Sequence, residues 1–267
     1  MDDVAAVKTA SSGLLGRLTP VVRRRAVSTI AHAFRAAGLI VTRRSKHPKT
    51  TFLGLAGRVF DVIVDVGANE GQFAISARTA FPSAHLVCVE PQPEPRQVLD
   101  TWARRDRNTT VLPVALGAST GEVEMNIHTD HDSSSSLLPS TQASLAADEA
   151  LRKQRQITVP IARLDDALAT VPQASGSAGR AVEVLLKLDV QGYEEQVLLG
   201  APLTLSRARA VILEVCLEPF YQGQASFDGL YRIVTAAGLE YRGNLDQVLG
   251  DDGRVMFLDA VFVRRAE

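Results

Sequence analysis

Hydrophobic and polar positions alternate along most of the chain between short apolar runs and segments with a helical repeat. The first pair is "VFDVIVDVG", a nearly continuous β-branched run, and "QFAISARTAF", a helical segment that ends before Pro82. The first of these runs is almost entirely apolar, as expected of a strand that is buried on both faces of a parallel sheet. The order repeats with "AHLVCVEP" as a strand, "EPRQVLDTWARR" as a helix and "TTVLPVALG" as a third strand.

The alternation of strands and helices is interrupted after the third strand, over about residues 118–160. We predict an exposed strand for "GEVEMNIHT" and a polar loop for "DHDSSSSLLPS". A helix is predicted for "ASLAADEALRKQRQ", and a strand leading into a helix for "ITVPIARLDDALATV". After the loop "PQASGSAGR", the alternation resumes with "VEVLLKLDVQG", "YEEQVLLGA", "RARAVILEVCLE" and "FDGLYRIVTAAG", and "RVMFLDAVFVRR" closes the chain as an edge or hairpin strand. The pattern predicts an open α/β sheet with an insertion or lid.

Residues 1–50 are expected to form a basic helical extension, and residues 51–267 the main domain. The extension has a helical repeat of apolar positions in "VVRRRAVSTIAHAFRAAGLIV" and only two acids, Asp2 and Asp3. Its basic residues are Lys8, Arg17, Arg23, Arg24, Arg25, Arg35, Arg43, Arg44, Lys46 and Lys49. Three interpretations stay open: packing on the main domain, peripheral contact with anionic lipid head groups, and recognition of an acidic substrate or partner. Nucleic acid is not expected, because no aromatic residues are interleaved.

Composition narrows the class of protein. With 46% hydrophobic and 22% charged residues among 267, the chain can build a substantial core, which excludes global disorder. Cys88 and Cys216 lie in apolar runs and are expected to be buried and reduced. Five scattered His and two Cys give no zinc-type spacing. No apolar run approaches the roughly 20 residues that cross a bilayer. The expected location is the cytoplasm, and the sequence does not indicate an oligomeric state.

The stretch "DVIVDVGANEGQF" has the layout of a nucleotide-binding turn. Its strand ends at Asp65, and a glycine-spaced turn follows at once. Gly67 allows a sharp turn and a close approach of the backbone to a ligand. Gly71 opens the next helix, whose free N–H groups favour a carboxylate or phosphate. In open α/β sheets, ligands bind at this edge.

The glycine spacing discriminates between cofactors. A dinucleotide fingerprint needs G-x-G-x-x-G, whereas here the spacing is G-x-x-x-G with Asn69 in the middle, and no P-loop pattern occurs. The turn has room for a nucleoside but no glycine path for a pyrophosphate, which favours S-adenosyl-L-methionine. Glu90 ends the next strand, where an acid can accept hydrogen bonds from both ribose hydroxyls. Asp65 can face the cationic amino group of the cofactor.

Several linked motifs resemble those of FkbM-like methyltransferases. They are "DVGANEGQF", "VEPQPE", "PVALG", "RLDD", "LLKLDVQGYEEQVLLGA" and "VILEV", in the family's order and approximate spacing over about residues 58–264. The resemblance implies the Rossmann-like class I fold, with a mostly parallel seven-stranded sheet and helices on both faces. It also implies an S-adenosylmethionine-dependent O-methyltransferase acting on a hydroxyl of a sugar, glycolipid or other secondary metabolite.

The resemblance also assigns roles to matching positions. The loop around the methionine part of the cofactor corresponds to Asp65, Gly67, Asn69, Gly71 and Phe73. Glu90 matches the ribose-binding acid, and Ala115, Leu116 and Gly117 match the segment that borders the adenine. The family commonly has Glu where this chain has Gln191, so no role of a carboxylate at that position is inherited.

Candidate catalytic groups lie on two strands. Methyl transfer needs an aligned nucleophile, and a poorly nucleophilic hydroxyl benefits from a base. Lys187 and Asp189 share one face of the fourth strand by alternation. Lys187 either orients a substrate hydroxyl, or forms an ion pair that holds Asp189 ionised. Glu214 interrupts "VILEVCL", which is costly unless it is paired or faces a cavity, so it is either an active-site acid or a structural partner of Lys187.

The insertion adds a cluster of polar residues in "HTDHDSSSS": His128, Asp130, His131 and Asp132. His131 is a candidate base, because histidine titrates near neutral pH. A divalent-metal site and a plain surface loop remain alternatives, and no metal is expected. If the loop closes over the sheet edge, Ser135 or Ser136 would contact cofactor or substrate.

The expected function is thus methyl transfer from S-adenosyl-L-methionine to a small-molecule or glycolipid acceptor. Two alternatives remain open: a binding module that keeps the cofactor fold without catalysis, and a nucleotide-dependent oxidoreductase, which the missing middle glycine disfavours.

Overall fold

The computed structural model describes residues 34, 36, 38, 47–130, 132–175 and 182–265. The chain divides into two units, Met1–His47 and Pro48–Glu267, which are treated separately. In the first unit, Phe34 and Ala36 are helical and Gly38 is in a turn. The rest of the predicted basic extension up to His47 lies outside the described residues. Within the described part of the chain, no helix is long and apolar enough to span a membrane.

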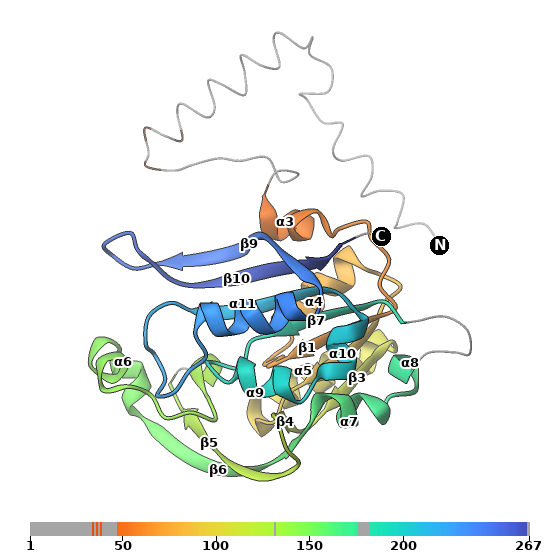
Figure 1. The fold of residues 1–267 in the computed structure, drawn as a ribbon. Helices are drawn as coiled ribbons and strands as arrows, with labels where there is room; N and C mark the ends of the chain where they lie inside the picture. Colours follow the sequence, from red (N-terminus) through yellow and green to blue (C-terminus); the bar gives the residue numbers. More distant parts are fainter. Residues whose placement is uncertain are drawn as a thin grey trace. The chain divides into compact units, whose positions relative to one another are not determined.

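The second unit is built on a seven-stranded sheet with the order β3-β2-β1-β7-β8-β10-β9 (Figure 1). The strands are β1 (Val62–Val66), β2 (His85–Val89), β3 (Thr109–Leu112), β7 (Val184–Leu188), β8 (Ala208–Cys216), β9 (Leu239–Leu249) and β10 (Val255–Arg264). The strand β10 runs antiparallel to both β8 and β9, and the other strand pairs of the sheet are parallel. The predicted, mostly parallel seven-stranded sheet is therefore confirmed.

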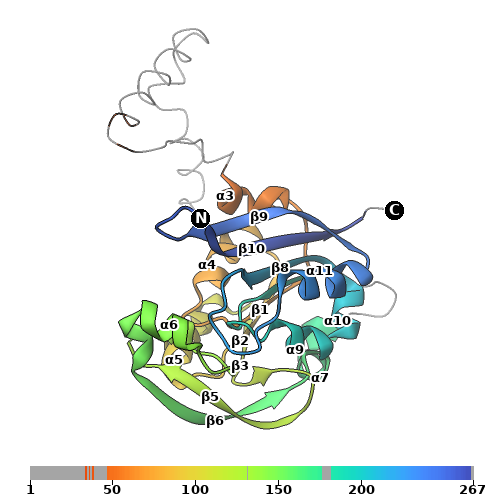
Figure 2. The same cartoon turned by 60° about the vertical axis from the view of Figure 1, so that its left-hand side comes forward.

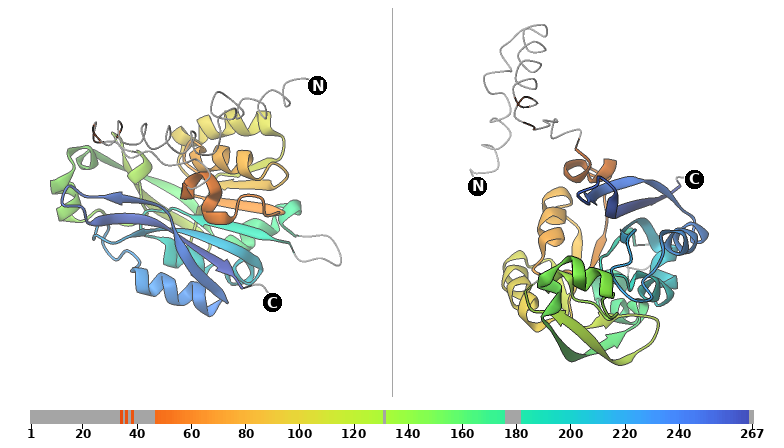
Figure 3. Two further views of the ribbon diagram at one scale, coloured as in Figure 1. Left: turned by 90° about the horizontal axis from the view of Figure 1, so that it is seen from above. Right: turned by 90° about the vertical axis from the view of Figure 1, so that its left-hand side faces the viewer.

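Helices cover both faces of this sheet, and each face has its own apolar core. One face packs against α4 (Gln72–Ala80) and α5 (Pro93–Asp106) through Ala74, Ala77 and Leu99. The other packs against α7 (Leu164–Ala169), α9 (Glu194–Leu199), α10 (Pro202–Arg207) and α11 (Phe227–Ala236). Figure 3 shows these two helical layers with the sheet between them. Every residue of β1 and β7 is buried, as expected of strands covered on both faces.

The insertion forms a second sheet of three strands with the order β4-β6-β5. It contains β4 (Ala115–Leu116), β5 (Gly121–His128) and β6 (Gln154–Ala162), with η5 (Asp132–Ser134), α6 (Gln142–Ala147) and η6 (Glu149–Arg152) between β5 and β6. In Figures 1 and 2 it lies at the end of the unit opposite β9 and β10. Beside β9 lie α3 (Pro48–Thr51) and η4 (Phe52–Gly54). The remaining described helix is α8 (Pro172–Ser175).

Two predicted elements differ in the structure, and one strand was not predicted. The strand "TTVLPVALG" is divided at Pro113 between β3 and β4, which belong to different sheets, because proline has no N–H to donate to a ladder. The helix predicted over "ASLAADEALRKQRQ" ends early, since Gln154 and Arg155 already pair with β5. The closing strand β10 forms a hairpin with β9, a strand that the apolar pattern did not reveal.

Candidate active site

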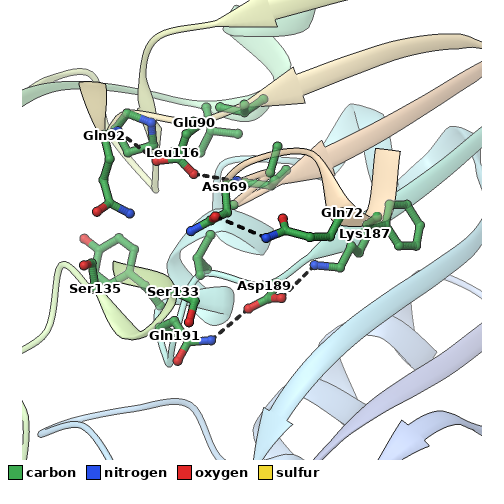
Figure 4. Close-up of a pocket in the computed structure, with 18 of the residues that line it drawn as sticks. Asn69, Gln72, Glu90, Gln92, Leu116, Ser133, Ser135, Lys187, Asp189 and Gln191 are labelled. Atoms are coloured by element: carbon green, nitrogen blue, oxygen red, sulfur yellow. Dashed lines mark hydrogen bonds and ion pairs between the residues drawn. The ribbon is translucent and has the colours of Figure 1, made fainter. Parts of the chain in front are cut away.

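A cavity of about 400 Å³ opens where β1, β2 and β7 end. The side chains along its wall include Asn69, Gln72, Glu90, Gln92, Leu116, Ser133, Ser135, Lys187, Asp189 and Gln191 (Figure 4). Parallel strands deliver their carboxyl ends to one edge of a sheet, which explains why groups far apart in the sequence meet here. The cavity also reaches the insertion, α4 and the β9–β10 hairpin.

The loop after β1 is shaped by its close approach to β7. Gly67 has a φ of +77°, and a Cβ at this position would lie 1.8 Å from the carbonyl oxygen of Asp189. Only glycine therefore fits between the two strand ends. Asn69 also has a positive φ, of 47°, which asparagine tolerates better than most residues. Its side-chain oxygen accepts a hydrogen bond from the backbone N–H of Glu70 at 2.7 Å, which fixes the turn locally.

We expect Gly67→Ala to destabilise the fold by about 3 kcal/mol or more, because it combines backbone strain with a clash against backbone atoms. Urea denaturation measures this loss. Gly253→Ala is the matched control: its φ is +80°, but nothing lies within 4 Å of the new Cβ, so only the strain of about 1–2 kcal/mol remains. Equal losses in the two variants would contradict the close approach.

Glu90 is the buried acid of the pocket. It follows β2, and its carboxylate accepts backbone hydrogen bonds from Asn69 and from Gln92, each at 2.8 Å. Burial raises the pKa of Glu90 to about 7, although the two N–H groups oppose this shift. The group thus joins the loops after β1 and β2, and it lines the cavity.

The small sheet and the insertion complete the wall near Glu90. Ala115 and Leu116 of β4 are buried and line the cavity, as do Ser135 and Ser136. The hydroxyl of Ser136 donates a hydrogen bond to the carbonyl oxygen of Gln191 at 2.7 Å, so the insertion is attached to the turn after β7. Contact of Ser135 or Ser136 with cofactor or substrate stays a prediction.

Lys187 lies at the centre of a buried charge network. Its ammonium is 2.8 Å from the Asp189 carboxylate and 3.9 Å from Asp65, and it lies 5.5 Å from the centre of the Phe73 ring. Burial alone would lower the pKa of Lys187, but the two carboxylates raise it above its ordinary value. Burial likewise opposes ionisation of Asp189, yet Lys187 keeps the pKa of that carboxyl below its usual range. Both groups are therefore charged at neutral pH.

Asp65 is placed behind the cavity wall. It is almost completely buried, and it is not among the residues that line the cavity. Neither carboxylate oxygen accepts a hydrogen bond among the described residues, and burial raises the pKa of Asp65 to about 6, against the attraction of Lys187. Its contact is thus with the Lys187 ammonium, and contact with a cofactor stays a prediction.

Gln191 links two carboxyl groups at the edge of the site. Its amide donates hydrogen bonds to Asp189 at 2.9 Å and to Glu214 at 2.5 Å, while its side-chain oxygen accepts one from the hydroxyl of Tyr221 at 2.7 Å. The turn that carries Gln191 is closed by Glu194, which accepts the N–H groups of residues 190 and 192. Gln191 therefore fixes the orientation of the Asp189 carboxylate.

Glu214 lies next to Asp189 and is not among the cavity-lining residues. Burial raises its pKa well above the ordinary value, and the charge of Asp189 raises it further. Both effects favour the protonated form of Glu214, which disfavours a role as a base. A hydrogen bond from Glu214 also lowers the pKa of Asp189. Its position suits a residue that holds Asp189.

The polar residues of the insertion take different positions. His128 is fully buried, and its ring nitrogens lie 2.8 Å from the carbonyl oxygen of Leu151 and 3.1 Å from the hydroxyl of Ser140. This histidine holds the insertion together and does not line the cavity. His131, the candidate base, lies outside the described residues. Among the residues that are described, no three His, Cys, Asp or Glu side chains form a metal-binding cluster.

Comparison with known proteins shows which family has this arrangement. The sequence profile of the "Methyltransferase FkbM domain" matches residues 65–241, more than half of the chain. The chain belongs to the FkbM methyltransferase family. The predicted family is thereby confirmed, and residues 65–241 are identified as a methyltransferase domain of this family.

Two curated proteins are similar over part of their length. The 2-O-methyltransferase NoeI of Sinorhizobium fredii is 28% identical over 169 residues, 61% of this chain and 66% of that protein. Methyltransferase sdnD of Sordaria araneosa is 31% identical over 154 residues, 52% of this chain and 59% of that protein. The chain thus spans just under two thirds of the length of the curated relatives that it matches.

A solved structure agrees with the fold. The crystal structure of the methyltransferase FkbM of Methylobacillus flagellatus superimposes with a TM-score of 0.50 and 14% sequence identity. The match covers 82% of this chain and 48% of that chain. At this identity the likeness concerns the fold alone, and it agrees with the class I fold that the resemblance implied.

The FkbM domain brings most of the predicted site residues together. Gly67, Asn69, Phe73, Glu90, Ala115, Leu116, Lys187 and Asp189 all line one cavity. Gly71, at a φ of +94°, begins α4 without lining the cavity.

Sequence reasoning missed the part of the cavity formed by Phe52, Leu245 and Asp259. For Asp259 a signal existed, because this acid interrupts the apolar run "VMFLDAVFV" as Glu214 interrupts "VILEVCL".

Proposed function

We propose that this protein is an S-adenosyl-L-methionine-dependent O-methyltransferase acting on a hydroxyl of a sugar, glycolipid or related metabolite. The observation that carries the proposal is the position of Glu90. A buried carboxylate, held by two backbone N–H groups, faces a cavity that has Asp189 and Lys187 on another part of its wall. An acid at this strand end suits the two ribose hydroxyls of an adenosine.

The cofactor would lie along the strand ends. Glu90 would accept hydrogen bonds from the ribose, while Leu116 and the apolar side chains beside it would border the adenine. Gly67 would let the methionine part approach the backbone, with Phe73 beside it. The negatively charged Asp189 would attract the cationic end of the cofactor, whose role is to supply an electrophilic methyl group.

The acceptor hydroxyl would receive this methyl group, which would exchange its bond to sulfur for a bond to oxygen. The hydroxyl proton must then leave. The methylated product is a strongly acidic protonated ether until it loses that proton. An ionised carboxylate of low pKa therefore suffices as the base. We assign this role to Asp189, with Lys187, Gln191 and Glu214 as the residues that orient it.

A hydroxyl acceptor is favoured by the family and by its relatives. NoeI is named as a 2-O-methyltransferase, which makes oxygen the expected nucleophile. The apolar and charged groups of the cavity also suit a small organic acceptor better than a polymer such as nucleic acid. Peripheral membrane contact of the basic N-terminal residues and a cytoplasmic location remain predictions from the sequence.

Cofactor affinity is expected to rise with pH through about 7. The pKa of Glu90 lies near 7 because of burial, and the ionised form accepts the ribose hydroxyls better than the protonated form. Binding should weaken by up to tenfold for each pH unit below 7, and it should release a proton near that pH. Calorimetric titration of S-adenosylhomocysteine from pH 6 to 8 measures both effects. Retention of the same pH dependence in Glu90→Gln would contradict the assignment.

Transfer itself is tested with a cofactor carrying ¹³C in its methyl group. The full chain is incubated with this cofactor and a panel of methyl glycosides, and carbon NMR identifies the labelled product. The proposal predicts an O-methyl resonance on at least one glycoside and stoichiometric S-adenosylhomocysteine. Label on nitrogen or sulfur would contradict the O-methyltransferase assignment. Bound cofactor without transfer to any glycoside or metabolite extract would favour a silent binding module.

A further inference from the structure

Part of the cavity lining comes from the β9–β10 hairpin and from aromatic residues near it. This part, called the acceptor end below, is lined by Phe52 of η4, Phe73 of α4, Leu245 of β9 and Asp259 of β10. Phe52 and Phe73 meet edge to face, with ring centres 5.9 Å apart. The acceptor end therefore combines an aromatic and aliphatic wall with one carboxylate.

Asp259 has no partner at this end among the described residues. No hydrogen bond or ion pair within the described part of the chain engages its carboxylate, which lines the cavity in the middle of an otherwise apolar strand. A partly buried acid without a partner is costly. Glu214, its cross-strand neighbour on β8, is by contrast engaged by Gln191. The exposed oxygen atoms of Asp259 are thus available to a ligand.

We propose that this end of the cavity binds the methyl acceptor, and that the Asp259 carboxylate accepts hydrogen bonds from hydroxyl groups of a saccharide. The inference rests on the proposed function, because it places the acceptor beside the methyl donor. A sugar ring has an apolar C–H face and a rim of hydroxyl groups. Phe52 and Leu245 match the first, and Asp259 matches the second.

Charge at the acceptor end supports the same occupant. Burial raises the pKa of Asp259 to about 6, while the ammonium of Lys187 opposes that shift. The carboxylate is therefore ionised at neutral pH and accepts hydroxyl protons without donating. The charged groups that act on it are Lys187 and Asp189 at the end of β7, Asp246 on β9 and Lys49 on α3. Its neighbour on β8 is Glu214, whose pKa is raised by burial.

The test measures saccharide binding to the full chain loaded with S-adenosylhomocysteine. Saturation-transfer NMR is recorded with methyl glycosides of hexoses and deoxyhexoses, for the wild type and for Asp259→Asn. We expect at least one glycoside to bind and the substitution to weaken its binding at least tenfold, with unchanged affinity for S-adenosylhomocysteine. Binding to the wild type should also fall as the pH drops below about 6.

Asp252→Asn is the matched control. Asp252 belongs to the turn of the same hairpin, is exposed and pairs with Arg254, so this variant should bind the glycoside like the wild type. Asp259→Ser serves as a second substitution, because it also removes the unpartnered charge and leaves room for the ligand.

Each outcome decides a different claim. Equal glycoside affinity in wild type and Asp259→Asn overturns the role of Asp259 and leaves methyl transfer untouched. Failure of every glycoside to bind the loaded wild type overturns the saccharide subsite. Failure of S-adenosylhomocysteine itself to bind overturns the proposed function.

Discussion

Glu90→Ala should lower the affinity for S-adenosylhomocysteine by about 100-fold or more. Each hydrogen bond to a charged acceptor contributes about 1.5–3 kcal/mol, and the ribose offers two hydroxyl groups to this carboxylate. Every 1.4 kcal/mol corresponds to a tenfold change in affinity, so losing both bonds exceeds two powers of ten. Isothermal titration calorimetry on the full chain measures the change.

The Glu90 carboxylate also holds the loop after β1, so the experiment needs two further variants as controls. Glu70→Ala removes an exposed acid from that loop, outside the cavity lining, and should bind cofactor like the wild type. Glu90→Gln keeps one acceptor oxygen of similar shape and should show an intermediate affinity. A wild-type affinity in Glu90→Ala, with the fold intact by circular dichroism, would remove Glu90 from the ribose site.

Asp189→Asn should reduce kcat by about 10²–10⁴-fold, the usual contribution of a positioned acid or base. The substitution preserves the shape of the side chain and removes the charge that pairs with Lys187 at 2.8 Å. Cofactor affinity should change far less than turnover, because Glu90 and the glycine loop are unaffected. The measurement is steady-state methyl transfer to a glycoside accepted by the wild type, with cofactor affinity determined separately.

The control for Asp189 is a carboxylate of the same type away from the cavity. Asp228 is exposed on α11 and pairs with Arg232, so Asp228→Asn should leave kcat and KM unchanged. If Asp189→Asn turned over at the wild-type rate, Asp189 would have no part in the proton transfer. A loss confined to cofactor affinity would reassign it to cofactor binding alone.

The part of the cavity proposed to hold the cofactor was predictable because it depends on local sequence. A strand that ends at Asp65, glycines at fixed spacing and an acid at the next strand end place Gly67, Asn69 and Glu90 around one cavity. Parallel strands end at the same edge, so local motifs suffice to bring them together. The same alternation of apolar and polar segments predicted the open α/β sheet, while its seven strands were expected from the family resemblance.

The acceptor end was not predictable from local patterns. Phe52 and Asp259 are separated by most of the chain, and they line one cavity only because β10 folds back between β8 and β9. The strand β9, which carries Leu245, is largely polar, with few buried positions, so its sequence lacks a clear alternation. The raised pKa of Glu214 was equally hidden, since it arises from burial and from the charge of Asp189.

The most direct test of the account is a crystal structure of the full chain with S-adenosylhomocysteine. The account predicts both ribose hydroxyls within hydrogen-bonding distance of the Glu90 carboxylate and the adenine beside Leu116. It also predicts that the sulfur atom faces the end of the cavity that holds Phe73 and Asp259. A cofactor bound outside this cavity, or bound with its sulfur turned away from Asp259, would contradict the account.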